Sequence, residues 1–193
     1  QAALPGVTIT HHDGADATDA ATIAADADAA IVVVGYTHHD EGEFVDNDGV
    51  AHLFHLFPPM TDPSIGERLQ AALQRGRSGH GMSPGGDRRT LRLRESHEAL
   101  IERVAARNPR TIVVVMGGSA VVMERWRQQV PAIVLLWYPG MEGGHALADV
   151  LLGRVTPSGR LPFAVPTDAA HLAPFDPDAD TVTYDLWHGQ WNL

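Results

Sequence analysis

The stretch that decides the fold is Ala30-Ile31-Val32-Val33-Val34-Gly35, an uninterrupted apolar run that ends at a glycine. Such a run of β-forming residues is typical of a strand buried on both faces. Thr111–Met116 and Ala132–Trp137 have the same character. Helical patterns lie between these runs, and strands of this kind that alternate with helices predict a mostly parallel sheet covered by helices on both faces. We therefore expect an α/β fold, a three-layer α/β/α sandwich.

Three segments carry the helical pattern. Residues 16–28 repeat apolar residues at helical spacing after an aspartate, and Ser96 is predicted to cap a second helix that ends at Asn108-Pro109. A third helix precedes Gly153, and a short strand is predicted at Val7–Thr10. These elements complete the alternation that the sandwich requires.

A long segment rich in Gly, Pro and His runs from about residue 36 to 90, with a helix predicted near 64–75. A connection of this length inside a domain is usually functional or mobile. It begins at the carboxyl end of the first predicted strand, where open α/β sheets bind their ligands. Functional residues are therefore expected in this segment.

Composition narrows the function. The 193 residues have a formal net charge of −10, which argues against binding to a nucleic-acid backbone. Cysteine is absent and all 14 basic residues are arginine, which excludes thiol catalysis, disulfides and lysine Schiff bases. No run approaches the roughly 18 apolar residues of a membrane span. The compartment stays open, because the chain begins at Gln1 without a visible signal peptide.

The segment His38-His39-Asp40-Glu41-Gly42-Glu43 is the first candidate site. A general acid needs a carboxyl group whose pKa is raised toward neutrality by burial or by a neighbouring carboxylate. Asp46 and Asp48 add further negative charge to this loop. Spacing alone favours a solvated acidic loop, and the acid/base role is the alternative.

Histidines in the same region raise the question of a metal site. Their spacing does not match a known metal-binding motif. His38, His39, His52 and His55 lie near the carboxylates and are of the type that binds zinc or manganese. No H-E-x-x-H motif is present. We expect ordinary hydrogen-bonding histidines, with no metal and no other cofactor.

Two glycine-containing motifs have structural and functional alternatives. Gly117-Gly118-Ser119 lacks the second glycine of a nucleophile elbow, since Val121 stands there, and a tight strand-to-helix turn is predicted. Gly86-Asp87-Arg88 supplies either a ligand-binding aspartate or an Asp–Arg pair that pins the long segment, with the second slightly favoured.

The aromatic residues also have two interpretations. They either stack on sugar rings or fill the core or an interface, and the core or an interface is favoured for Trp126 and Trp137. The other candidates are Tyr138, Trp187 and Trp191.

Several motifs in order resemble the second domain of glycoside hydrolase family 3, the β-glucosidase-type enzymes. The stretch from Val130 through Trp137-Tyr138-Pro139-Gly140 to Gly153 carries most of the likeness. The resemblance covers roughly residues 15–190. Its other motifs are Gly86-Asp87-Arg88 with Leu91 and Leu93, Gly117–Met123, Pro157–Phe163 and Thr183–Gly189.

The resemblance implies a retaining exo-acting β-glycosidase, most simply a β-glucosidase. In that family an N-terminal (β/α)8-type barrel supplies the Asp nucleophile, and a loop of the second domain supplies the acid/base Glu. Glu41 with Gly42 fits this loop best, although Phe44 comes one position later than usual, and Glu43 is the alternative. Asp40, Phe44, Asp87 and Arg88 are the substrate-binding candidates.

Departures from the family pattern suggest that this chain is a fragment or one polypeptide of a larger enzyme. Residues 1–193 are expected to form the C-terminal domain alone, with the barrel absent and the sheet incomplete at its N-terminal edge. The segment 45–85 looks like an insertion, and Gln190–Leu193 departs from the family's usual continuation. We expect the isolated chain to be inactive. The alternative is a non-catalytic carbohydrate-binding or interface module of the same fold, and sugar and linkage specificity stay open.

Overall fold

The computed structural model describes residues 6–37, 40, 88, 90–173 and 179–184. The chain divides into two units, one formed by Gln1–Gly35 with Leu91–Leu193 and the other by Tyr36–Thr90. Each unit is described by itself. The helix predicted near 64–75 lies outside the described residues.

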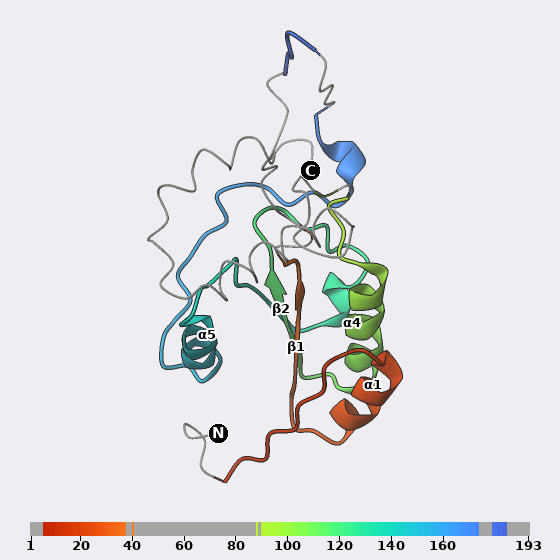
Figure 1. Ribbon diagram of the computed structural model, residues 1–193, viewed down its shortest axis with the longest axis vertical. Coiled ribbons are helices and arrows are strands. Elements are labelled where there is room, and N and C mark those ends of the chain that lie inside the picture. Colours follow the sequence, from red (N-terminus) through yellow and green to blue (C-terminus); the bar gives the residue numbers. More distant parts are fainter. Residues whose placement is uncertain (1–5, 38–39, 41–87, 89, 174–178, 185–193) are drawn as a thin grey trace, which may run out of the picture. The chain divides into compact units, whose positions relative to one another are not determined.

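A parallel sheet forms the centre of the first unit (Figure 1). Its strands are β1 (Ala30–Gly35), β2 (Thr111–Met116) and β3 (Ala132–Leu135), in the order β1-β2-β3. Both pairs are parallel, as the apolar runs predicted. The third strand is shorter than predicted, because Trp137 has a φ of 58°, a left-handed backbone conformation that no strand continues through.

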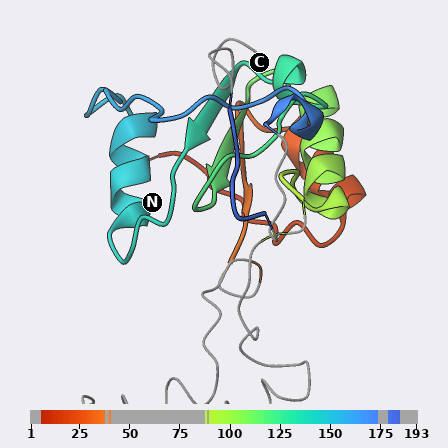
Figure 2. The same ribbon diagram turned by 90° about the horizontal axis from the view of Figure 1, so that it is seen from above.

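Two helices, α1 (Ala17–Ala25) and α4 (Glu95–Arg107), pack together on one face of the sheet (Figures 1 and 2). Three buried alanines of α1, at positions 20, 21 and 24, present small side chains to this layer. Ile101 and Val104 of α4 are buried as well. The helices and this sheet face form the core of the unit.

The beginnings of these helices differ. Asp16 caps α1, since its Oδ1 accepts hydrogen bonds from the backbone N–H groups of Thr18 and Asp19 at 2.7 and 3.2 Å. The predicted cap at Ser96 is wrong: α4 begins earlier, Arg94 occupies the cap position, and Ser96 lies inside the first turn. The Arg94 carbonyl oxygen accepts the first helical hydrogen bonds, from His97 and Glu98.

A buried asparagine joins the ends of the two helices. Asn108 follows α4, and its Nδ2 donates to the carbonyl oxygens of Ala24 and Ala27 at 2.8 and 2.9 Å. Its Oδ1 accepts from the Arg110 backbone N–H at 2.8 Å. All of its side-chain polar atoms are thus used, as a buried amide requires.

The third helix, α5 (Gly143–Leu151), lies on the other side of the sheet in both views (Figures 1 and 2). Helices therefore flank both faces, and the predicted α/β class is confirmed. Cover on the α5 side is partial, because Ile31 and Val33 of β1 point to this face and are both exposed. In the part of the chain that the structure describes, the other regular elements are two single-turn 3₁₀ helices, η2 (Arg127–Gln129) and η3 (Ala169–His171).

Two local predictions are wrong. Val7–Thr10 is not a strand; Val7 and Ile9 are exposed, and the strands with described partners are those of the β1-β2-β3 sheet. Gly117-Gly118-Ser119 does not lead directly into a helix. The chain instead forms an isolated bridge between Arg92 and Val122 in which the Val122 N–H donates to the Leu91 carbonyl oxygen at 2.8 Å.

Candidate functional site

The carboxyl end of β1 has a glycine that no other residue could replace without a backbone shift. Gly35 has a φ of 146°, and a Cβ built on it would lie 1.9 Å from the carbonyl oxygen of Met116. Gly35 and Met116 are paired in the ladder between β1 and β2. The close approach fixes the point where the segment that carries the predicted acid/base residues begins.

In the second unit, a tight turn over Thr37–Asp40 follows. The Asp40 N–H donates to the Thr37 carbonyl oxygen at 2.8 Å. In return, Asp40 Oδ2 accepts from the Thr37 N–H at 2.9 Å and from the Thr37 hydroxyl at 3.2 Å. The Asp40 carboxylate therefore holds the backbone immediately before Glu41. Its proposed contact with substrate stays a prediction.

The same unit contains a contact between its two ends. The guanidinium carbon of Arg88 lies 4.3 Å from the centroid of the Tyr36 ring, and Tyr36 is only 5% exposed. A cation over the face of a tyrosine ring is attracted by the ring quadrupole, by about 0.5–2 kcal/mol depending on desolvation. The sequence suggested Asp87 as the partner of Arg88, and Asp87 lies outside the described residues.

The other predicted site residues lie outside the described part as well. Glu41, Glu43 and Phe44 belong to this group. So do the four histidines considered as metal ligands, at positions 38, 39, 52 and 55. Among the residues that the structure describes, no group of three or more His, Asp or Glu side chains could hold a metal ion.

Ser119 lines a hollow at the carboxyl ends of β2 and β3. Its walls include Val115, Leu135 and Trp137, and its volume of about 10 Å³ has room for about one water molecule. Trp137 meets Phe163 edge to face, with ring centroids 5.7 Å apart. Trp126 is fully buried, which confirms its predicted core role. This hollow is too small for a sugar substrate.

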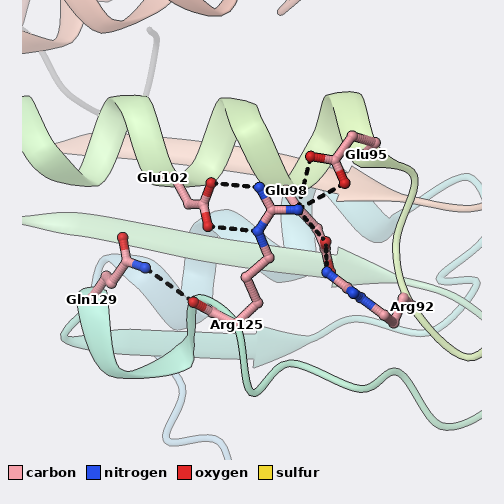
Figure 3. Close-up of polar contacts among 6 residues, drawn as sticks. All are labelled: Arg92, Glu95, Glu98, Glu102, Arg125 and Gln129. Atoms are coloured by element: carbon pink, nitrogen blue, oxygen red, sulfur yellow. Dashed lines mark hydrogen bonds and ion pairs between the residues drawn. The ribbon is translucent and has the colours of Figure 1, made fainter.

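A cluster of ion pairs in the first unit was not found by sequence reasoning. We call it the Glu98 cluster; it consists of Arg92, Glu95, Glu98, Glu102 and Arg125 (Figure 3). Its three glutamates share one face of α4, because their spacing in the helix is i, i+3 and i+7. That spacing is the sequence signal, but it resembles an ordinary solvated face.

Arg125 is the centre of this cluster. It forms two hydrogen bonds with Glu102, at 2.7 and 2.9 Å, and two with Glu95, at 2.7 and 2.8 Å. Glu98, only 1% exposed, accepts from Arg125 at 3.1 Å and also pairs with Arg92. Arg125 lowers the pKa of Glu95 through these hydrogen bonds, and the glutamates raise the pKa of Arg125. Because each charged side chain of the cluster has a partner of opposite charge, the cluster is suited to holding the fold and not to transferring protons.

The Glu98 cluster links α4 to two other stretches of the first unit. Arg92 belongs to the chain that returns to the first unit, whereas Arg125 follows β2 and its carbonyl oxygen accepts from Gln129 of η2 at 3.0 Å (Figure 3). Glu98 therefore ties both stretches to α4.

The part of the chain that the structure describes contains no helix with the length and apolar character needed to cross a membrane.

A parallel sheet with helices on both sides places the chain in the α/β class of proteins. The family model of the glycosyl hydrolase family 3 C-terminal domain matches residues 4–189, and the chain belongs to this family. This confirms the resemblance found in the motifs.

Named relatives and a solved structure agree with this assignment. The chain is 41% identical over 120 residues to a β-glucosidase of Rhizobium radiobacter, covering 58% of this chain and 14% of that protein. It is 48% identical over 82 residues to β-glucosidase BoGH3A of Bacteroides ovatus, covering 42% of this chain and 11% of that protein. The crystal structure of a β-D-glucoside glucohydrolase from Trichoderma reesei has the same fold, with a TM-score of 0.59 at 24% identity; the match covers 85% of this chain and 18% of that one. The chain thus spans a small part of each relative.

Proposed function

We propose that this chain supplies the general acid/base carboxyl of a retaining β-glycosidase, with Glu41 as the acid/base residue and Glu43 as the alternative. The observation that carries the proposal is the family match over residues 4–189, which includes the acidic stretch of sequence that follows β1. The β-glucosidase names of the relatives favour a β-linked glucoside as substrate.

The chemistry requires two carboxyl groups with different tasks. The acid/base glutamate protonates the glycosidic oxygen while an aspartate attacks the anomeric carbon, and the same glutamate then takes a proton from the incoming water. The two carboxyl groups lie about 5 Å apart in retaining enzymes. Asp40 is already engaged by Thr37, which favours its glutamate neighbours for the acid role. No cofactor takes part in this reaction.

The nucleophile comes from a partner, an N-terminal (β/α)8-type barrel domain or chain. The isolated chain is therefore expected to show no turnover of a nitrophenyl β-glucoside. Turnover by the isolated chain that Glu41→Gln abolishes would overturn the need for the barrel.

The acid role is tested by Glu41→Gln and Glu43→Gln in the assembly of this chain with its barrel. One of the two variants should lose about 10²–10⁴-fold in kcat/KM on a glucoside with a poor leaving group, as removal of a general acid requires. Azide should restore turnover of an activated glucoside in that variant. If both variants stay within about tenfold of the wild type, the acid role fails and a non-catalytic binding module is the better description.

A further inference from the structure

We propose that Tyr36 and Arg88 are positioning residues for the acid/base carboxyl, acting by fastening the two ends of the segment Tyr36–Thr90 to each other. The inference rests on the proposed function, because it assumes that Glu41 or Glu43 performs the proton transfer. It assigns Arg88 a role other than the substrate contact that the family resemblance suggested, and one closer to the pinning role favoured from its motif.

The contact joins two residues that are far apart in the sequence and stand at opposite ends of the segment Tyr36–Thr90. Tyr36 is the first residue after β1, and Arg88 stands just before the chain returns to the first unit at Leu91. The guanidinium carbon lies 4.3 Å from the ring centroid, over the face of a tyrosine that is buried. A buried aromatic ring with a cation on its face is a structural arrangement, since this face of the ring is not available to a sugar.

Each end of the segment leaves the first unit from a fixed point. Gly35 is held against Met116 in the sheet, and no larger residue fits there. On the return, Leu91 accepts a hydrogen bond from Val122, and Arg92 pairs with the buried Glu98. The Tyr36–Arg88 contact adds a side-chain link between the two ends.

A short, hydrogen-bonded path leads from Tyr36 to the proposed acid. The turn over Thr37–Asp40 is closed by one backbone hydrogen bond and by two hydrogen bonds to the Asp40 carboxylate. Glu41 is the next residue. Displacing Tyr36 would therefore displace the backbone that leads to Glu41. Small displacements of a catalytic group are costly for the rate, because proton transfer needs hydrogen-bond distance to the leaving oxygen.

The experiment compares substrates with different need for the acid, in the assembly of this chain with its barrel. A 2,4-dinitrophenyl β-glucoside has a leaving group that departs without a proton, whereas a methyl β-glucoside needs one. The ratio of the two kcat/KM values is independent of how much protein is active. It therefore separates misplacement of the acid from a general loss of folded enzyme.

Arg88→Met and Tyr36→Leu are expected to lower kcat/KM on the methyl glucoside about tenfold more than on the dinitrophenyl glucoside, a part of the full general-acid effect. Tyr36→Phe keeps the ring that Arg88 contacts and should change the ratio less than Tyr36→Leu does. Arg88→Lys keeps the charge without the planar group and should give an intermediate ratio; it serves as the test if Arg88→Met does not fold. Arg107→Met, which removes an exposed arginine at the end of α4, is the matched control and should also leave the ratio unchanged.

Two failures can be told apart. An unchanged ratio in Arg88→Met or Arg88→Lys and in Tyr36→Leu, alongside a changed ratio in Glu41→Gln or Glu43→Gln, overturns the positioning role alone. An unchanged ratio in both glutamine variants overturns the proposed function, and the inference with it.

Discussion

The two faces of strand β1 are made of the same apolar residues, yet they differ in cover. Val32 and Val34 of β1 lie on the α4 side of the strand and are buried. Ile31 and Val33 alternate with them on the α5 side, and each is 52% exposed. We call these the covered face and the open face.

The difference teaches what an apolar strand does and does not encode. The four branched apolar side chains of β1, at positions 31 to 34, are all more stable when buried. Alternation along the strand only places them on two opposite faces. The packing of the helices determines whether each face is buried. On the covered face, the small alanines of α1 and the buried Ile101 of α4 pack as one layer, whereas α5 leaves part of the open face in contact with solvent.

The largest expected effect comes from the Glu98 cluster, which fastens α4 of the covered face to its flanking loops. Glu98→Ala removes the charge-assisted hydrogen bonds that this buried carboxylate accepts from the partly exposed Arg92 and Arg125, and should lower the free energy of unfolding by about 3 kcal/mol. Urea unfolding of the purified chain followed by circular dichroism measures this loss.

Glu102→Ala is the matched control, because Glu102 also binds Arg125 but is partly exposed. It should cost below about 1 kcal/mol. A loss of that size for Glu98→Ala too would mean that burial of Glu98 does not matter for stability.

The second expected effect compares the two faces by the same valine-to-alanine substitution on each of them. Val113 of β2 is 0% exposed on the covered face, and Val33 of β1 lies on the open face. Val113→Ala removes two buried methyl groups and leaves a cavity, so we expect a loss of about 2 kcal/mol. Val33→Ala should cost less than about 1 kcal/mol, since half of its side chain already contacts water.

The same unfolding measurement gives both values. Equal losses would contradict the difference between the faces and would mean that Val33 is covered in solution. Val33→Thr adds a check, because a hydroxyl is tolerated on the open face and is costly at Val113 on the covered face.

The strands and helices of the sheet were predictable because each carries its own local signal. The run Ala30–Gly35 and the two later apolar runs predicted β1, β2 and β3. The end of β3 was not predictable, because a left-handed φ at Trp137 depends on its surroundings and not on its side chain. The strand expected at Val7–Thr10 failed for a similar reason: a pattern of β-forming residues makes no strand without a neighbour to bond.

The sequence singles out the residues proposed for the site, whereas the contacts that the structure describes beside them could not be predicted. The acidic loop and the Gly86-Asp87-Arg88 motif stood out in the sequence. The stacking of Arg88 on Tyr36 joins residues at opposite ends of a long segment, and no local pattern indicates such a pair. The Glu98 cluster was missed because three glutamates on a helix face ordinarily indicate solvent, whereas here Arg125 arrives from beyond β2.

The smallest expected effect is a pH dependence at the outer edge of the same cluster. Glu95 is exposed, and hydrogen bonds from Arg125 hold its pKa below the usual value for glutamate. A carboxyl with a lower pKa in the folded state stabilises the fold above its unfolded pKa, and this contribution is lost as the pH falls through the folded pKa. The free energy of unfolding should therefore fall less between pH 6 and about pH 3 in Glu95→Gln than in the wild type, and high salt should narrow that difference by screening the exposed pair. Identical pH dependence in the two proteins would show that the Arg125–Glu95 pair does not contribute in solution, leaving Glu98 and Glu102 as the carboxylates through which the cluster acts.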